Sequence, residues 1–116
     1  MIVIKGDSDK SVVLKNFIQK DFLTDKIVVL DSVGVSKWNN VDWATIYPLG
    51  NQSSYHDTIR YFENSYEPLK GFDWVVFYVD ADEDSIQDFK SLDRRYPQNI
   101  IVALKGNNGL TTKYYI

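Results

Sequence analysis

Four short hydrophobic runs divide the chain and predict the strands of a sheet. They are continuous rather than alternating, and they are rich in Ile and Val. Strands that are buried on both faces, as in a parallel sheet, have this pattern. The runs are Ile2–Ile4, Ile27–Leu30, Trp74–Val79 and Ile100–Leu104. We therefore expect a mostly parallel central sheet of about four strands.

The segments between these runs carry hydrophobic residues at the spacing of an α-helix. Each begins at residues that can cap a helix: Ser8 or Asp9, Ser53 or Ser54, and Asp84–Ser85. The expected inward faces are, in chain order, Val13, Leu14, Phe17 and Ile18; Tyr55, Ile59, Phe62, Tyr66 and Leu69; and Ile86, Phe89, Leu92 and Tyr96. Pro97 should end the third helix, because proline cannot continue one.

The alternation of strands and helices predicts an α/β fold in three layers, with right-handed crossovers. A chain of 116 residues suits one domain, so residues 1–116 are expected to form a single unit. Two segments are less regular. Residues 43–50 fit an extra short strand that ends at Pro48, and residues 110–116 fit either an edge strand or a tail.

Composition narrows the classes of function. The net charge of −3 argues against a sequence-independent nucleic-acid binder, which needs a basic surface. The chain has no cysteine, so neither a disulfide framework nor a zinc–thiolate site is available. No run approaches the ~20 apolar residues of a membrane span, and the start lacks the apolar segment of a signal peptide. We expect a cytoplasmic protein that does not enter a membrane.

The stretch "YVDADED" places four carboxylates directly after the most hydrophobic run, on Asp80, Asp82, Glu83 and Asp84. Ligands of open parallel sheets bind beyond the carboxyl ends of the strands. Clustered carboxylates repel one another unless a positive charge lies among them. A metal ion, a cation of the protein or water alone could meet this requirement.

Three stretches resemble the Toprim domain of type II topoisomerases, primases and overcoming-lysogeny-defect nucleases. "IVIKGDSD" is similar to its first strand, where a Glu-Gly pair is followed by an aspartate, and "VDADED" resembles its Asp-x-Asp motif. "IVVLDSVGVSKWNN" looks like its second strand with the exit loop. The resemblance covers roughly residues 1–105. It implies a Toprim-like fold in which Asp80, Asp82 and Asp84 hold Mg²⁺, a cation that prefers carboxylate oxygens.

The resemblance also implies binding roles for residues at the other strand exits. These residues are Gly6, Asp7, Asp9, Ser36 and Lys37. The catalytic glutamate of the family, however, is replaced here by Lys5, so no catalytic residue is assigned. A protonated lysine cannot bind Mg²⁺, and it brings a positive charge to the place that the metal would take.

Lys5 is therefore interpreted as a built-in counterion of Asp80 or Asp82, on an adjacent central strand, and Mg²⁺ binding is expected to be weak. This favours a degenerate Toprim-like module that binds or regulates in a nucleic-acid-related process without catalysis. Its partner would be a nucleic-acid enzyme or a nucleic acid. The alternative is a Mg²⁺-dependent nuclease or phosphotransferase that uses the Asp80–Asp82–Asp84 cluster. The sequence indicates no oligomeric state.

Two other phosphate-handling folds compete with this interpretation. "GDSDKS" resembles a degenerate P-loop, but Lys10 follows Gly6 too closely and the second glycine of the motif is absent. Nucleotide hydrolysis is therefore not expected. A receiver domain would use Asp7, Asp80 as phosphoacceptor and Lys105, but the acceptor of a receiver normally lies nearer to mid-chain.

The remaining candidates are a lone histidine and an aromatic group. His56 has no partner for a catalytic triad that the sequence can identify, so it is not assigned a role. Trp38, Trp43 and Tyr47 lie in the least regular segment. Their rings could stack on nucleic-acid bases, form a protein interface or cap the core.

Overall fold

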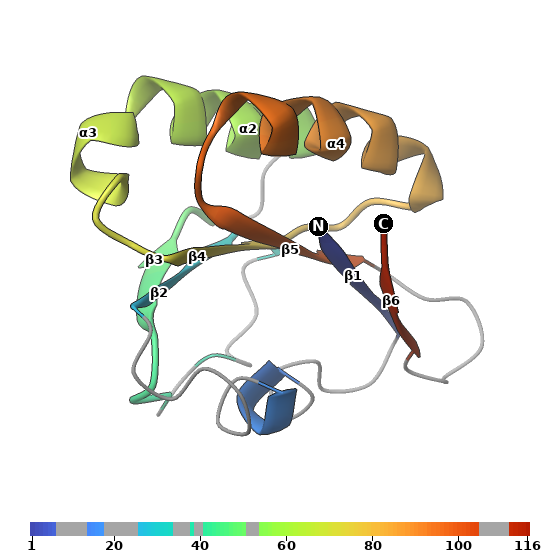
Figure 1. The fold of residues 1–116 in the computed structure, drawn as a ribbon, viewed down its shortest axis with the longest axis horizontal. Helices are drawn as coiled ribbons and strands as arrows, with labels where there is room; N and C mark the ends of the chain where they lie inside the picture. The colour runs from blue at the N-terminus through green and yellow to red at the C-terminus, as the bar shows by residue number, and fades with distance from the viewer. Residues whose placement is uncertain (7–13, 18–25, 34–37, 39–40, 51–53, 105–111) are drawn as a thin grey trace.

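A computed structural model describes residues 1–6, 14–17, 26–33, 38, 41–50, 54–104 and 112–116. Its centre is a six-stranded sheet with the order β3-β2-β4-β5-β1-β6 (Figure 1). The strands are β1 (Ile2–Lys5), β2 (Ile27–Asp31), β3 (Thr45–Pro48), β4 (Trp74–Tyr78), β5 (Asn99–Leu104) and β6 (Thr112–Tyr115). Every pairing is parallel except that of β6 with β1.

The α/β architecture and the mostly parallel sheet are confirmed, whereas the expected count of four strands was too low. The four hydrophobic runs form β1, β2, β4 and β5. Residues 43–50 contribute β3, which ends at Pro48 as expected, and the C-terminal segment contributes β6 as an edge strand. These two strands are only partly hydrophobic, because each lies at an edge of the sheet and pairs with one strand instead of two.

The helices follow the predicted stripes with one interruption. They are α2 (Tyr55–Asn64), α3 (Tyr66–Leu69), a 3₁₀ turn labelled η2 (Glu83–Ser85) and α4 (Ile86–Arg95), and residues 14–17 are also helical. Ser54 caps α2 by accepting a hydrogen bond from the His56 N–H. The stripe expected over residues 55–69 divides at Ser65, because Pro68 in a continuous helix would clash with the carbonyl of Asn64. The caps expected at Ser8 or Asp9 lie outside the described residues.

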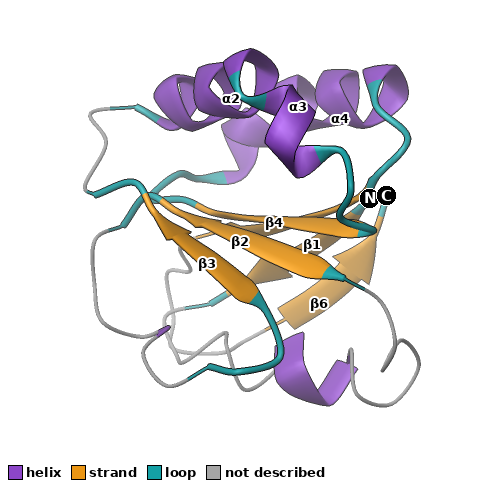
Figure 2. Ribbon diagram, turned by 90° about the vertical axis from the view of Figure 1, so that its left-hand side faces the viewer, coloured by secondary structure: helices purple, strands orange, loops and turns teal. Residues whose placement is uncertain are grey.

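The sheet lies between two layers of helix, which makes three layers (Figures 1 and 2). Alternate side chains of β4 enter the two cores, as the pleat of a strand requires. Val75 and Phe77, with Val79 just after the strand, pack under α2, α3 and α4. Trp74, Val76 and Tyr78 pack against Leu14 and Phe17 on the opposite face. Among the described residues, no helix is long and apolar enough to cross a membrane.

Candidate functional site

The carboxyl ends of the parallel strands form one edge of the sheet, and most candidate residues lie there. In register, Lys5 of β1 is beside Leu104 of β5, and Asp31 of β2 is beside Tyr78 of β4. Helices α2 and α4 also begin at this edge, since they follow β3 and β4. The positive ends of their dipoles are therefore on the same side as the strand exits.

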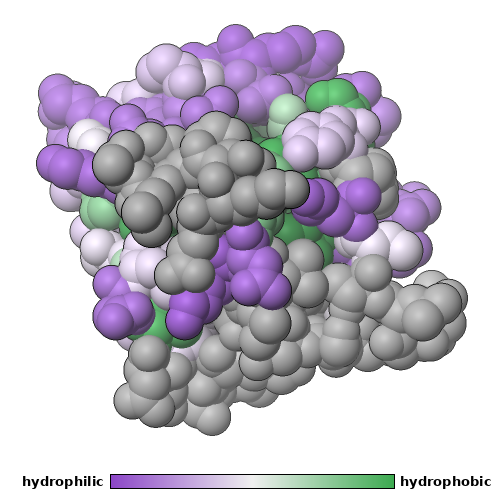
Figure 3. Space-filling model, turned by 60° about the horizontal axis from the view of Figure 1, so that its bottom comes forward, coloured by the Kyte–Doolittle hydropathy of each residue, from purple (hydrophilic) through white to green (hydrophobic). Residues whose placement is uncertain are grey.

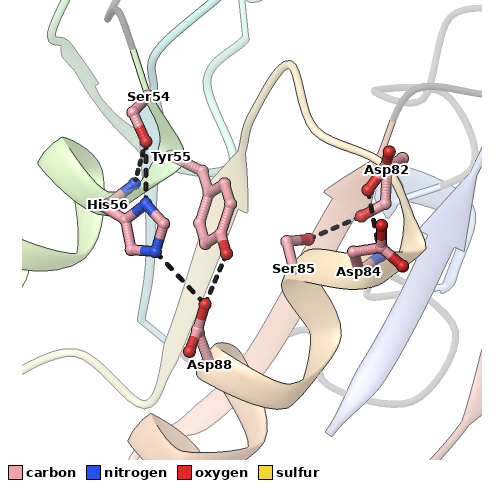
Figure 4. Close-up of polar contacts among 7 residues, drawn as sticks. All are labelled: Ser54, Tyr55, His56, Asp82, Asp84, Ser85 and Asp88. Carbon is pink, nitrogen blue, oxygen red and sulfur yellow. Dashed lines mark hydrogen bonds and ion pairs between the residues drawn. The ribbon is translucent and has the colours of Figure 1, made fainter.

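The acidic turn after β4 is largely solvated and is partly used by the backbone (Figure 4). Asp80, Asp82 and Asp84 are all exposed. Asp82 caps η2, because its Oδ1 accepts a hydrogen bond of 3.0 Å from the Asp84 N–H. The hydroxyl of Ser85 donates to the Asp82 carbonyl at 2.8 Å. One carboxylate of the turn, that of Asp82, therefore serves to start the η2 turn that leads into α4.

Lys5 reaches this turn from the other side of β5. Its Nζ lies 2.9 Å from Oε1 of Glu83, with 26% of the lysine side chain and 57% of the glutamate side chain exposed. A lysine counterion of the acidic turn was expected, with Asp80 or Asp82 as its partner, and the ion pair that joins Lys5 to the turn is made with Glu83. The expectation that β1 and β4 are adjacent was wrong, because β5 lies between them. Glutamate has one methylene more than aspartate, which helps Glu83 to span this separation.

Of the five other predicted binding residues, Gly6 is the one that the structure describes. Gly6 is buried, and its N–H donates to the Leu104 carbonyl at 3.2 Å, which continues the pairing of β1 with β5. Asp7, Asp9, Ser36 and Lys37 lie outside the described residues. Within the described part of the chain, no three His, Cys, Asp or Glu side chains gather closely enough to hold a metal ion.

A buried polar contact fastens the exit of β2 to α2. Ser32 and Thr58 are 4% and 0% exposed, and their hydroxyl oxygens are hydrogen-bonded to each other. Asp31 is also buried, at 5% exposed, and its Oδ1 accepts a hydrogen bond of 3.1 Å from the Val33 N–H. The Ser32–Thr58 contact ties α2 to the exit of β2, and the Asp31–Val33 hydrogen bond orders the exit itself.

A second polar cluster joins the first turns of α2 and α4 (Figure 4). Oγ of Ser54 lies 2.9 Å from Nδ1 of His56, and Nε2 of the same histidine lies 3.4 Å from Oδ2 of Asp88. The hydroxyl of Tyr55 donates to the same carboxylate oxygen. Sequence reasoning left His56 without a role, because the sequence does not indicate that these two helices are neighbours. The cluster connects the two helices across the edge of the candidate site.

The electrostatic influence of the acidic turn extends to this cluster. The pKa of Tyr55 is raised to about 12, mainly by the hydrogen bond to Asp88. Burial raises this pKa further, as do the negative charges of Asp88, Asp82 and Asp84. The phenol therefore stays protonated at neutral pH and continues to donate its hydrogen bond.

The aromatic residues of the irregular segment do not form one cluster. Trp38 is 4% exposed and packs in T-shaped contacts on Tyr78 and Trp43, with ring centroids 5.2 and 6.2 Å apart. Tyr47 packs against the core on the opposite face of the sheet. Trp38 therefore caps the core instead of offering a surface on which a base could stack.

Comparisons with protein-family models, with curated proteins and with solved structures give no match for this chain.

Proposed function

We propose that this chain is a binding or regulatory module in a nucleic-acid-related process, with a phosphate-handling site that no longer catalyses a reaction. One observation carries the proposal: the ion pair between Lys5 and Glu83 brings a protein cation to the acidic edge of the sheet. Enzymes that use clustered carboxylates for phosphoryl chemistry need Mg²⁺ at such a place to stabilise the developing charge. An ammonium group in contact with the turn repels that ion and cannot replace its Lewis acidity.

The position of the site supports a binding role. The carboxyl edge of a parallel sheet is where α/β proteins bind their ligands. Here it collects a cation on Lys5, the acidic turn and the N-termini of two helices. In this proposal the partner is a nucleic-acid enzyme rather than bare nucleic acid, because the net charge of −3 opposes strong binding to a polyanion.

The strand order favours a second candidate, a nucleotide-binding module with a degenerate P-loop. One strand, β5, separates the strand before Gly6 from the strand that ends at the acidic turn. The Toprim resemblance implied adjacent strands, so this separation favours the rival interpretation of "GDSDKS" as a degenerate P-loop. In P-loop proteins an aspartate at the position of Asp80 holds Mg²⁺, and a loop lysine contacts the phosphates. Lys10 is the lysine available in this sequence, and the missing second glycine weakens the phosphate cradle.

Neither cleavage of nucleic acid nor hydrolysis of ATP is expected from the purified protein in millimolar Mg²⁺. The physical reason is the cation at the acidic edge, together with the incomplete phosphate loop. Gel assays with single- and double-stranded DNA and RNA, and a phosphate-release assay with ATP, measure this directly.

The Asp80→Ala variant is the control for a contaminating enzyme. Cleavage by the wild type that disappears in Asp80→Ala would overturn the proposal in favour of a Mg²⁺-dependent nuclease. The same preparations separate the two candidates. Retention of a fluorescent ATP analogue by the wild type but not by Lys10→Ala would select the nucleotide-binding module.

A further inference from the structure

Strand β6 is one edge of the sheet, and its pairing with β1 determines which backbone groups it presents outward. The Ile116 N–H donates to the Met1 carbonyl at 2.9 Å, and the Met1 amine donates to the Ile116 carbonyl at 3.4 Å. Hydrogen-bonded and non-hydrogen-bonded pairs alternate along antiparallel strands. The next hydrogen-bonded pair along β6 is therefore Tyr114 with Val3, and the pairs of Lys113 and Tyr115 are non-hydrogen-bonded. The N–H and C=O groups of Lys113 and Tyr115 consequently point away from β1.

The side chains of this edge are accessible, and Lys113 is the one charged residue of the strand. Lys113 is exposed, and Tyr115 and Ile116, at 66% and 46% exposed, are the large hydrophobic residues most exposed among the described ones. Natural edge strands avoid association through short length, proline, bulges or charged side chains, lysine above all. β6 has one charge and no proline, whereas β3 at the opposite edge ends in Pro48.

We propose that β6 pairs antiparallel with β6 of a second copy of this chain, so that the two sheets continue into one another. In the register that we infer, Lys113 lies opposite Tyr115 of the second copy. By the two-fold symmetry, Tyr115 lies opposite Lys113 of the second copy. Each of these two pairs exchanges two hydrogen bonds. The outward N–H and C=O groups of Lys113 and Tyr115 on each strand are then all hydrogen-bonded. Because both copies use the same strand, the contact is isologous, as in a two-fold dimer.

Charge selects this register over its neighbour. A register with Lys113 opposite itself would place two ammonium groups side by side, which is destabilising in a strand pair. With Lys113 opposite Tyr115, each cation meets an aromatic ring of the second copy. Within one chain, Nζ of Lys113 lies 4.1 Å from the ring centroid of Phe17 and 5.9 Å from that of Tyr115, so this cation already contacts aromatic rings. Cation–π contacts of this kind favour association.

The predicted contact is small. It consists of four backbone hydrogen bonds and the side chains of one four-residue strand. The hydrophobic areas among the described residues in Figure 3 are also limited in extent. Interfaces well below the standard size are weak and transient. We therefore expect a dimer that forms as the protein concentration rises.

Cysteine cross-linking tests the register, since the chain has no cysteine of its own. Position 114 lies on the two-fold axis opposite itself, in a non-hydrogen-bonded pair whose Cα atoms are about 4.5 Å apart, which suits a disulfide. Tyr114→Cys should therefore oxidise to a covalent dimer at least tenfold faster than Lys113→Cys, whose sulfur would face position 115. Equal rates for the two variants, at matched concentration and with matched melting curves, would overturn the register.

Light scattering after size exclusion tests the pairing itself, independently of any cysteine. The wild-type mass should rise from 13.5 kDa towards twice that value between micromolar and millimolar concentration. Lys113→Pro removes an outward N–H, which an edge strand tolerates, and should keep the protein monomeric at all concentrations. Lys113→Ala keeps the N–H and should still dimerise. A wild type that stays at 13.5 kDa, or a proline variant that dimerises like the wild type, would refute the proposal.

Discussion

Replacing Phe62 by alanine is expected to lower the free energy of unfolding by about 3–5 kcal/mol. Phe62 of α2 is fully buried, and its ring contacts those of Phe77, Tyr66 and Tyr96 with centroids 5.5, 5.6 and 4.9 Å away. The truncation removes apolar contacts and leaves a cavity between α2 and the sheet that this packing cannot fully close. For a domain of this size the melting temperature should fall by roughly 10–20 °C.

Phe72→Ala is the matched control for this variant. The same atoms are removed, but Phe72 is half-buried at the margin of the same core. Its loss should cost clearly less, because solvent already reaches the ring and the remaining space opens to water. Urea unfolding of both variants gives the comparison. Equal losses would mean that α2 does not pack on the sheet through Phe62 in the way described above.

Thr58→Val is expected to cost about 1–3 kcal/mol, because it leaves the buried hydroxyl of Ser32 without its partner. The two hydroxyls bond each other beneath α2, and valine has the shape of threonine without the oxygen. Ser32→Ala should cost a similar amount for the same reason. The double variant Ser32→Ala/Thr58→Val removes both polar groups together, so it should cost less than the sum of the two single variants.

A double-mutant cycle on unfolding free energies measures this coupling. We expect a coupling energy of about 1 kcal/mol or more, typical of residues in direct contact. Additive losses, within about 0.5 kcal/mol, would show that the two hydroxyls are not paired and that the exit of β2 is not fastened to α2 through them.

The sequence predicts the strands of this fold well because burial on both faces leaves a clear pattern. The run from Trp74 to Val79 is continuous and hydrophobic, and its first five residues form the fully buried strand β4. The stripe from Tyr55 to Leu69 likewise predicts the helical segment. It misses the break at Ser65, although Pro68 provides a local signal four residues after Asn64.

The sequence predicts which residues lie at the candidate site, but it does not predict which of them contact one another. That Lys5 and the acidic turn share one edge follows from the polar residues that end each hydrophobic run. The order of the strands is decided by tertiary packing, and no local pattern indicates that β5 separates β1 from β4. The partner of Lys5 and the contact of His56 with Asp88 depend on that order, so sequence reasoning missed both.

The central claim is that Lys5 replaces a metal ion at the acidic edge, and Mg²⁺-dependent melting of Lys5→Glu tests it most directly. The variant loses the ion pair with Glu83 and adds a carboxylate beside it, so without metal it should be less stable than the wild type. A ligand that binds only the folded state stabilises it by mass action. With a dissociation constant of about 1 mM, 10 mM Mg²⁺ would add about 1.4 kcal/mol. This corresponds to a rise of roughly 5 °C in melting temperature.

Lys70→Glu is the matched control, because it makes the same charge change beside Glu67, in an exposed ion pair away from the acidic turn. Melting curves of the wild type, Lys5→Glu and Lys70→Glu are recorded with and without Mg²⁺ at constant ionic strength. We predict a clear rise in melting temperature for Lys5→Glu and little or none for the other two. A rise of the same size in the wild type and Lys5→Glu would contradict the claim, because it would show that Lys5 does not keep Mg²⁺ from this edge of the sheet.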